Sequence, residues 1–129
     1  GDESEFEIMK RHTVIGGDTL KLSEEIIRKK FTYLTMARHI AYSHHEKFDG
    51  SGYPNGTKGE EIPLSARIVA VADVYDAMTS KRCYKDAFSH ETAKKFILDQ
   101  AGKHFDDEVV EAFLVVEAEF IGIMERMNS

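Results

Sequence analysis

The spacing of apolar residues predicts helices over most of the chain. A Ser-x-x-Glu capping box at residues 4–7 opens the first of them. Its apolar side contains Phe6, Met9, Val14 and Leu20. A second helix is expected over about residues 32–45, where apolar residues recur at helical spacing. Residues 22–30 between them are charged and irregular, which predicts a short helix or a loop.

The middle of the chain holds a long loop followed by a very apolar helix. Residues 46–61 contain four glycines and one proline. Loops of this length in compact domains usually carry function. Pro63 is suited to the first position of the next helix, which we expect over residues 64–80. This segment, LSARIVAVADVYDAMTS, is apolar nearly all round, which is typical of a buried central helix.

The last third of the chain predicts two more helices. Ser89 is expected to cap a fourth helix that ends near Gly102. Asp106 is expected to cap a fifth, long helix that reaches about Met127. No segment has the pattern of a strand or a repeat. The predicted fold is therefore all-α, a bundle of about five helices in a single domain over residues 1–129.

Composition narrows the class of protein. The chain has 129 residues, of which 42% are apolar, and this suffices for one core. A net charge of −6 argues against a general nucleic-acid binder, which carries a basic face. Cys83 is the only cysteine, so no intrachain disulfide can form, which fits a reducing compartment. No apolar run is long enough to span a membrane and no signal-peptide pattern opens the chain, so we expect a cytoplasmic protein.

Asp73 stands out because it lies within the apolar helix. A carboxylate on such a helix is expected to be buried. A buried charge is very costly unless it meets a cation, a metal ion or several hydrogen-bond donors. Two interpretations are open for Asp73: it is a metal ligand, or it forms a structural salt bridge with Arg67 or another arginine.

Two adjacent histidines, His44 and His45, precede the long loop, and His12 lies on a different predicted helix. Imidazole is the commonest neutral metal ligand, and metal sites in helical bundles are built from facing helices. Together with Asp73 these histidines suggest a site of nitrogen and oxygen ligands, which suits Fe, Mn, Ni or Zn. His12 could instead be a core or surface residue, and the pair could be solvated. We assign no catalytic role to His39, His90 or His104.

A basic cluster of Lys81, Arg82 and Lys85 follows the helix that carries Asp73. Arg82 and Lys85 could reach phosphate oxygens near a metal ion held by Asp73, since arginine forms forked contacts and lysine is a point charge. The alternative is an ordinary solvated loop.

Several separated motifs then follow one another along the chain. They are His44-His45-Glu46, Asp49-Gly50, Gly52-Tyr53-Pro54, residues 59–63, residues 66–77 and His104-Phe105-Asp106. In this order they closely resemble the signature of HD-GYP domains. These domains are metal-dependent phosphodiesterases of the HD superfamily that open cyclic di-GMP in bacterial signalling. The resemblance covers about residues 5–114.

The resemblance implies a metal centre. His12, His44 and His45 match three ligands of one divalent metal ion, and Asp73 matches a ligand of a neighbouring ion. By this resemblance Fe or Mn is the preferred metal, with Zn or Ni as alternatives.

The resemblance also implies a substrate and partners. Arg82 and Lys85 match basic residues that hold the phosphates of a cyclic dinucleotide. Gly52, Tyr53 and Pro54 belong to a loop that lines the site and that contacts GGDEF-type partner domains in the family. No duplex nucleic acid and no membrane is expected as a partner.

One departure from the family pattern is important. The pair of His followed by Asp that gives the family its name occurs nowhere in these 129 residues. The chain therefore resembles the C-terminal part of an HD-GYP domain, and we expect it to be inactive or very slow by itself. Two other functions stay open: a non-catalytic HD-GYP-like binding or regulatory module, and a hydrolase of another phosphate ester. A truncated bundle would expose apolar surface, which predicts a homodimer.

Overall fold

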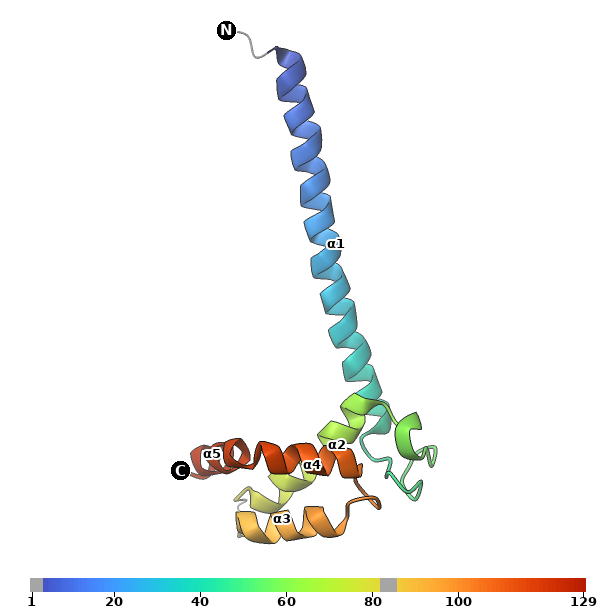
Figure 1. The fold of residues 1–129 in the computed structure, drawn as a ribbon, viewed down its shortest axis with the longest axis vertical. Helices are drawn as coiled ribbons and strands as arrows, with labels where there is room; N and C mark the ends of the chain where they lie inside the picture. Colours follow the sequence, from blue (N-terminus) through green and yellow to red (C-terminus); the bar gives the residue numbers. More distant parts are fainter. Residues whose placement is uncertain (1–3, 82–85) are drawn as a thin grey trace. The chain divides into compact units, whose positions relative to one another are not determined.

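The computed structural model describes residues 4–81 and 86–129 (Figure 1). Two compact units, Gly1–Ala37 and Arg38–Ser129, are described separately below. Five α-helices and one short 3-10 helix form within the described residues: α1 (Glu5–Ser43), η1 (Gly59–Glu61), α2 (Leu64–Thr79), α3 (His90–Asp99), α4 (Asp107–Val115) and α5 (Glu117–Asn128). The described residues contain no strand, only an isolated bridge between Ala101 and Phe105. The all-α prediction is confirmed.

Helix α1 is continuous where the sequence predicted two helices with a short helix or loop between them. It begins directly after Ser4, and two acidic residues in its first turn, Glu5 and Glu7, favour that end of the helix dipole. Residues 22–30 contain no glycine or proline and are rich in Leu, Glu, Ile, Arg and Lys, which propagate a helix well. No residue of α1 is buried, so local propensity alone sets its length.

Helix α2 is the central helix of the second unit, as predicted. It packs against α3 and α4 (Figure 1), and it has more buried residues than any other described helix. Its buried residues are Ala66, Ala70, Val71, Tyr75 and Thr79. The sequence predicted Pro63 as the first helical residue. It is instead the N-cap residue, and the helix begins one position later, at Leu64.

The core of the second unit forms where α2, α3 and α4 meet. Ala93 and Ile97 from α3 are fully buried, and Val110 and Phe113 from α4 are each 3% exposed. Burying each large apolar side chain stabilises the fold by about 1.5–3 kcal/mol. These contacts fix the position of α2, which carries part of the candidate site.

The two predicted caps are present. The Ser89 side chain accepts a hydrogen bond from the Thr92 N–H and begins α3. The Asp106 side chain accepts one from the Glu108 N–H and begins α4. The prediction of one long helix after Asp106 was wrong, because the chain forms two helices, α4 and α5. They are separated at Val116, where φ is −104° and ψ is 17°. The break lets Phe120 of α5 turn back into the core.

Aromatic rings fill the space that this break creates. The Phe120 ring meets the rings of Tyr75 and Phe113 edge-on, with centroids 5.0 Å and 4.9 Å away. Edge-to-face pairs of this kind add to the stability that burial provides. No helix in the described parts of the chain is long and apolar enough to cross a membrane.

Candidate metal centre

A cavity of about 350 Å³ in the second unit gathers several residues that the sequence singled out. It is lined by His44, His45, Lys47, Tyr53, Ala70, Asp73, Val74, Ala77 and His104. The histidine pair, the helical aspartate and the tyrosine of the long loop thus lie around one space. Two further residues, Lys47 and His104, belong to the same lining and were assigned no role from sequence.

His44 is held in a defined tautomer. Its Nδ1 atom lies 2.7 Å from the carbonyl oxygen of Ile40, one turn earlier in α1. A carbonyl oxygen only accepts hydrogen bonds, so the proton of a neutral His44 ring is on Nδ1 and the lone pair is on Nε2. This is the arrangement that a metal-binding histidine adopts, with its other nitrogen donating to a backbone carbonyl.

His45 lies between His44 and the long loop. Its ring centroid is 4.1 Å from that of His44, and it stacks on the Tyr53 ring with centroids 4.9 Å apart and planes 16° apart. The Tyr53 N–H donates to the His45 carbonyl oxygen at 3.2 Å. The loop is therefore folded directly against the second histidine.

Two residues force the loop into this position. A side chain at Gly52 would place its Cβ 2.4 Å from the His45 carbonyl oxygen and 2.4 Å from the Lys47 nitrogen, so only glycine fits. Glu46 is 3% exposed, and its carboxylate accepts hydrogen bonds from the Asn55 N–H and the Thr57 N–H. These two backbone donors compensate the buried charge. The sequence marked Glu46 only as part of a motif.

The sequence predicted that Asp73 is buried, and this prediction was wrong, because its side chain is exposed. Four residues of α2 line the cavity at helical spacing, namely Ala70, Asp73, Val74 and Ala77. Asp73 therefore lies on the side of α2 that faces this cavity, a side that it shares with the buried Ala70.

The salt bridge considered between Asp73 and Arg67 is not formed. The Arg67 Nη1 atom is 2.5 Å from the Asp106 Oδ2 atom, and the Arg67 Nε atom donates to the Ile62 carbonyl oxygen at 2.8 Å. Arg67 therefore contacts Asp106, the residue that caps the N-terminus of α4. Arg67 is therefore not the partner of Asp73, and metal binding and a salt bridge with another arginine stay predictions for Asp73.

His104 reaches the cavity from a distant part of the sequence. The Phe48 N–H donates to the His104 carbonyl oxygen at 3.0 Å, and the Asp49 N–H donates to the Lys103 carbonyl oxygen at 2.8 Å. The His104 ring stacks on the Phe105 ring with centroids 4.2 Å apart. Burial, and then the positive charge of Lys47, lower the pKa of His104. The only sequence signal for His104 was its place in the His-Phe-Asp motif.

The structure does not test the remaining predicted site residues. His12 belongs to the unit Gly1–Ala37 and the histidine pair to the unit Arg38–Ser129, so the grouping of His12 with the pair stays a prediction. Arg82 and Lys85 lie outside the described residues.

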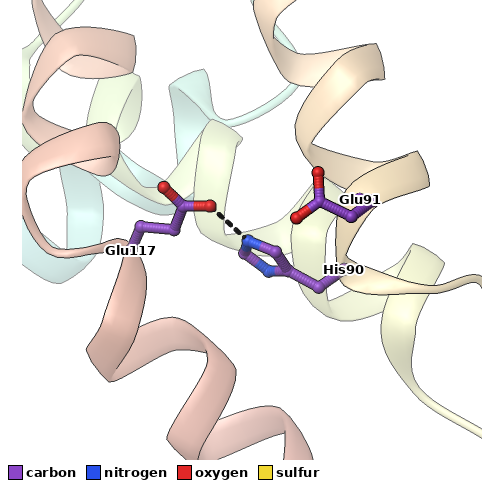
Figure 2. Close-up of side chains that lie close together, drawn as sticks. All are labelled: His90, Glu91 and Glu117. Atoms are coloured by element: carbon purple, nitrogen blue, oxygen red, sulfur yellow. Dashed lines mark hydrogen bonds and ion pairs between the residues drawn. The ribbon is translucent and has the colours of Figure 1, made fainter.

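A second cluster of ligand-type side chains joins α3 to α5. Among the described residues, His90, Glu91 and Glu117 place ligand atoms within 4.8 Å of one another. Figure 2 shows the His90 ring directed at Glu117, with Glu91 beside it. The distance from His90 Nε2 to Glu117 Oε1 is 2.8 Å, and the other ring nitrogen is 2.8 Å from the Tyr75 hydroxyl.

This cluster is complete without a metal ion. The Lys94 ammonium lies 2.9 Å from the same Glu117 oxygen. The hydrogen bonds from His90 and Lys94 lower the pKa of Glu117, which keeps the carboxylate ionised. A metal ion would have to displace Lys94, so we interpret the cluster as a structural link between α3 and α5.

A family model described as HD domain matches residues 3–109 of the chain. The chain belongs to the HD-domain family. Membership agrees with the resemblance inferred from the histidine pair and the Gly-Tyr-Pro loop, and that inference is confirmed. HD-domain proteins are metal-dependent, which fits a cavity lined by histidines and a carboxylate.

Curated relatives of this HD domain carry related names. A cyclic di-GMP phosphodiesterase of Vibrio cholerae is 50% identical over 121 residues, which is 94% of this chain and 24% of the relative. A cyclic di-GMP phosphodiesterase of Thermotoga maritima is 48% identical over 122 residues, 95% of this chain and 32% of the relative. A 3'3'-cGAMP-specific phosphodiesterase 2 of V. cholerae is 43% identical over 122 residues, 95% of this chain and 22% of the relative. The HD-domain chain thus spans between about a fifth and a third of the length of these relatives.

Proposed function

We propose that this HD-domain chain is part of a metal-dependent phosphodiesterase that hydrolyses cyclic di-GMP in bacterial signalling. The observation that carries the proposal is the single cavity that gathers His44, His45 and Asp73. The names of the cyclic di-GMP phosphodiesterases that are 48–50% identical support the choice of substrate. We propose further that the chain is the C-terminal portion of one HD-GYP domain and acts in the cytoplasm.

The types of residue that line the cavity suit a divalent metal ion, although the ligand atoms of His44, His45 and Asp73 do not all lie within 4.8 Å of one another. The His44 Nε2 atom has its lone pair available because Nδ1 donates to Ile40. His45 adds a second imidazole and Asp73 a carboxylate in the same cavity. Such nitrogen and oxygen donors suit Fe or Mn, with Zn or Ni as alternatives. A bound divalent ion would polarise a phosphate oxygen and lower the pKa of a bound water.

The protein's own part in this chemistry is to position the groups. The bond to Ile40 fixes the tautomer and ring orientation of His44. Stacking against Tyr53 limits rotation of the His45 ring. His12 is proposed as a third nitrogen ligand, and Arg82 and Lys85 as contacts for the phosphates of the substrate.

The Gly-Tyr-Pro loop is also proposed as a contact surface for a GGDEF-type partner domain. Tyr53 is 62% exposed even though its ring stacks on His45, and Pro54 is exposed beside it. The loop therefore offers one face to the cavity and another to a partner.

We also propose that the chain forms a homodimer. The supporting observation is the set of exposed apolar side chains on α1, which includes Phe6, Met9, Leu20 and Phe31. Static light scattering is expected to give twice the monomer mass. A single monomeric species over the whole range of concentrations would contradict the dimer.

Two observations keep other functions in view. The absence of a His-Asp pair in these 129 residues favours a non-catalytic binding or regulatory module for the chain by itself. The relative named as a 3'3'-cGAMP-specific phosphodiesterase favours a different cyclic dinucleotide as substrate.

One experiment separates these possibilities. The chain is loaded with Mn²⁺, and binding and hydrolysis of cyclic di-GMP and 3'3'-cGAMP are measured by calorimetry and chromatography. We expect metal-dependent binding of cyclic di-GMP with very slow turnover or none. The Asp73→Ala variant is expected to lose this binding, and His39→Ala, whose ring is not part of the cavity lining, is expected to retain it. A fully metal-loaded chain that binds neither nucleotide would refute the proposed function.

A further inference from the structure

We propose that Lys47 and His104 form a phosphate-binding subsite beside the candidate metal centre, which holds a phosphate group of the substrate. The proposal deepens the proposed function and rests on it for the identity of the substrate as a phosphate diester. It assigns a role to two residues that line the cavity and for which the sequence suggested none.

Lys47 brings a positive charge to the cavity. It is the one lysine or arginine among the described residues that line this cavity, and it follows the histidine pair by two residues. None of the ion pairs between described residues includes Lys47. The neighbouring carboxylate of Asp49 is engaged by Ser51, whose N–H and hydroxyl lie 2.9 Å and 2.6 Å from the same oxygen. A lysine in the lining adds a positive charge near the cavity, and this charge would attract an anion that enters it.

His104 supplies a rigid hydrogen-bonding group to the same space. Its backbone is attached to the segment after the histidine pair by the bond from the Phe48 N–H. Its ring stacks on Phe105, a core residue that is 1% exposed. An imidazole anchored in this way loses little side-chain entropy when it binds a ligand. A neutral ring has one N–H, which can donate to a phosphate oxygen.

His104 lines the cavity together with the cationic Lys47, which supports a role in contact with an anionic substrate. Among the described residues, the set with ligand atoms all within 4.8 Å of one another is the cluster of His90, Glu91 and Glu117. Neither His104 nor Asp73 forms such a set with His44 and His45, although all four line one cavity.

When no metal ion is bound, a cation in the cavity lining balances the charge of Asp73. Asp73 places a carboxylate in the lining, and it would repel a phosphate. Lys47 offsets this repulsion, and His104 adds direction because a hydrogen bond depends on angle. Together the two residues would fix one phosphate while the opposite part of the substrate stays free to reach other contacts.

Calorimetric titrations of the 129-residue chain test the subsite. Inorganic phosphate and cyclic di-GMP are used as separate probes, each with and without Mn²⁺. We expect Lys47→Gln to weaken binding of both probes by about tenfold or more, the size expected for a hydrogen bond to a charged group. Lys47→Arg is expected to retain most of the affinity. His104→Phe keeps the ring that stacks on Phe105 and removes both nitrogens, and we expect a loss of several-fold.

Lys103→Gln is the matched control. It removes one positive charge from an exposed side chain next to His104, outside the cavity lining, and it leaves the backbone bond to Asp49 in place. We expect its affinities to equal those of the unchanged chain. Circular dichroism of every variant checks that the fold is intact. If Lys47→Gln does not fold, the comparison of Lys47→Arg with His104→Phe still decides the matter.

The two probes separate the subsite from the proposed function. Phosphate binding that depends on Lys47 and His104, without binding of cyclic di-GMP, would support the subsite and refute the substrate. Tight binding of cyclic di-GMP that neither substitution changes would overturn the subsite and leave the function standing. An equal loss in Lys103→Gln would also overturn it, because general charge would then explain the effect.

Discussion

The carboxylate of Glu46 accepts a hydrogen bond from the backbone N–H of Asn55, 2.9 Å away and nine residues later in the chain. A second bond, from the Thr57 N–H at 3.1 Å, uses the other carboxylate oxygen. Because Glu46 directly follows His45, these bonds join the histidine pair to the far side of the Gly-Tyr-Pro loop.

Replacing Glu46 tests this join. Glu46→Gln keeps the size of the side chain but turns one acceptor into an amide donor that faces a backbone N–H. We expect the free energy of unfolding to fall by about 1–3 kcal/mol, the cost of leaving a buried partner unsatisfied. Chemical denaturation measures it. Glu60→Gln, an exposed residue of the same loop region, is the control and should change stability little.

Gly52 is the second test of the loop. The Cβ of Gly52→Ala would lie 2.4 Å from backbone atoms of His45 and Lys47, and neither can move alone. We expect a loss of about 1–3 kcal/mol or more from this overlap, together with loss of metal binding. Gly17→Ala has nothing within 4 Å of its Cβ in α1 and is expected to stabilise the helix by about 0.5–1 kcal/mol. Similar stabilities for both variants would disprove the overlap.

The histidine pair makes a prediction about metal uptake. His44→Ala and His45→Ala each remove one imidazole from the cavity, and we expect each to abolish stoichiometric binding of Mn²⁺ by the chain. His39→Ala removes an imidazole from the end of the same helix without touching the cavity lining. Metal analysis after gel filtration gives the stoichiometry. A His44→Ala chain that still retains one equivalent of metal would remove His44 from the ligand set.

The lowered pKa of Glu117 predicts how the stability of the fold depends on pH. Hydrogen bonds from His90 and then Lys94 lower its pKa in the folded protein below the ordinary value of 4.5. A carboxylate with a lowered folded pKa contributes stability that is present above its unfolded pKa and is lost as the pH falls through the folded one. We therefore expect Glu117→Gln to lower stability at pH 7 and to flatten the acid side of the stability curve.

The control for this prediction is Glu119→Gln, two residues later on α5 and exposed. Denaturation midpoints between about pH 3 and pH 7 should follow the unchanged protein in this variant. If Glu117→Gln shows the same acid dependence as the unchanged chain, the bonds to His90 and Lys94 do not stabilise the fold.

Features that depend on neighbouring residues were predictable from the sequence. Ser89 and Asp106 cap α3 and α4 because each side chain bonds to an N–H two or three residues later, and such contacts need no tertiary structure. The central position of α2 followed from its composition, because a helix that is apolar nearly all round has to be surrounded.

Features that depend on distant contacts were not predictable. The break at Val116 is set by the packing of Phe120 against Tyr75, which is 45 residues away in the chain. The exposure of Asp73 reflects which side of α2 the other helices cover, and apolar composition does not reveal that side. Glu46, Lys47 and His104 gained their roles only when the loop and the segment before α4 were placed together.

The two backbone bonds from Phe48 and Asp49 to the segment 103–104 also constrain when the site can form during synthesis. The histidine pair, the Gly-Tyr-Pro loop and Asp73 all emerge from the ribosome before His104 does. A nascent chain that stops short of Lys103 therefore contains every proposed metal ligand but lacks one wall of the pocket. Closing a loop of more than fifty residues is entropically costly until the contacts on both sides exist. The ability to bind a phosphate group should therefore appear late in translation, after the proposed metal ligands have already been synthesised.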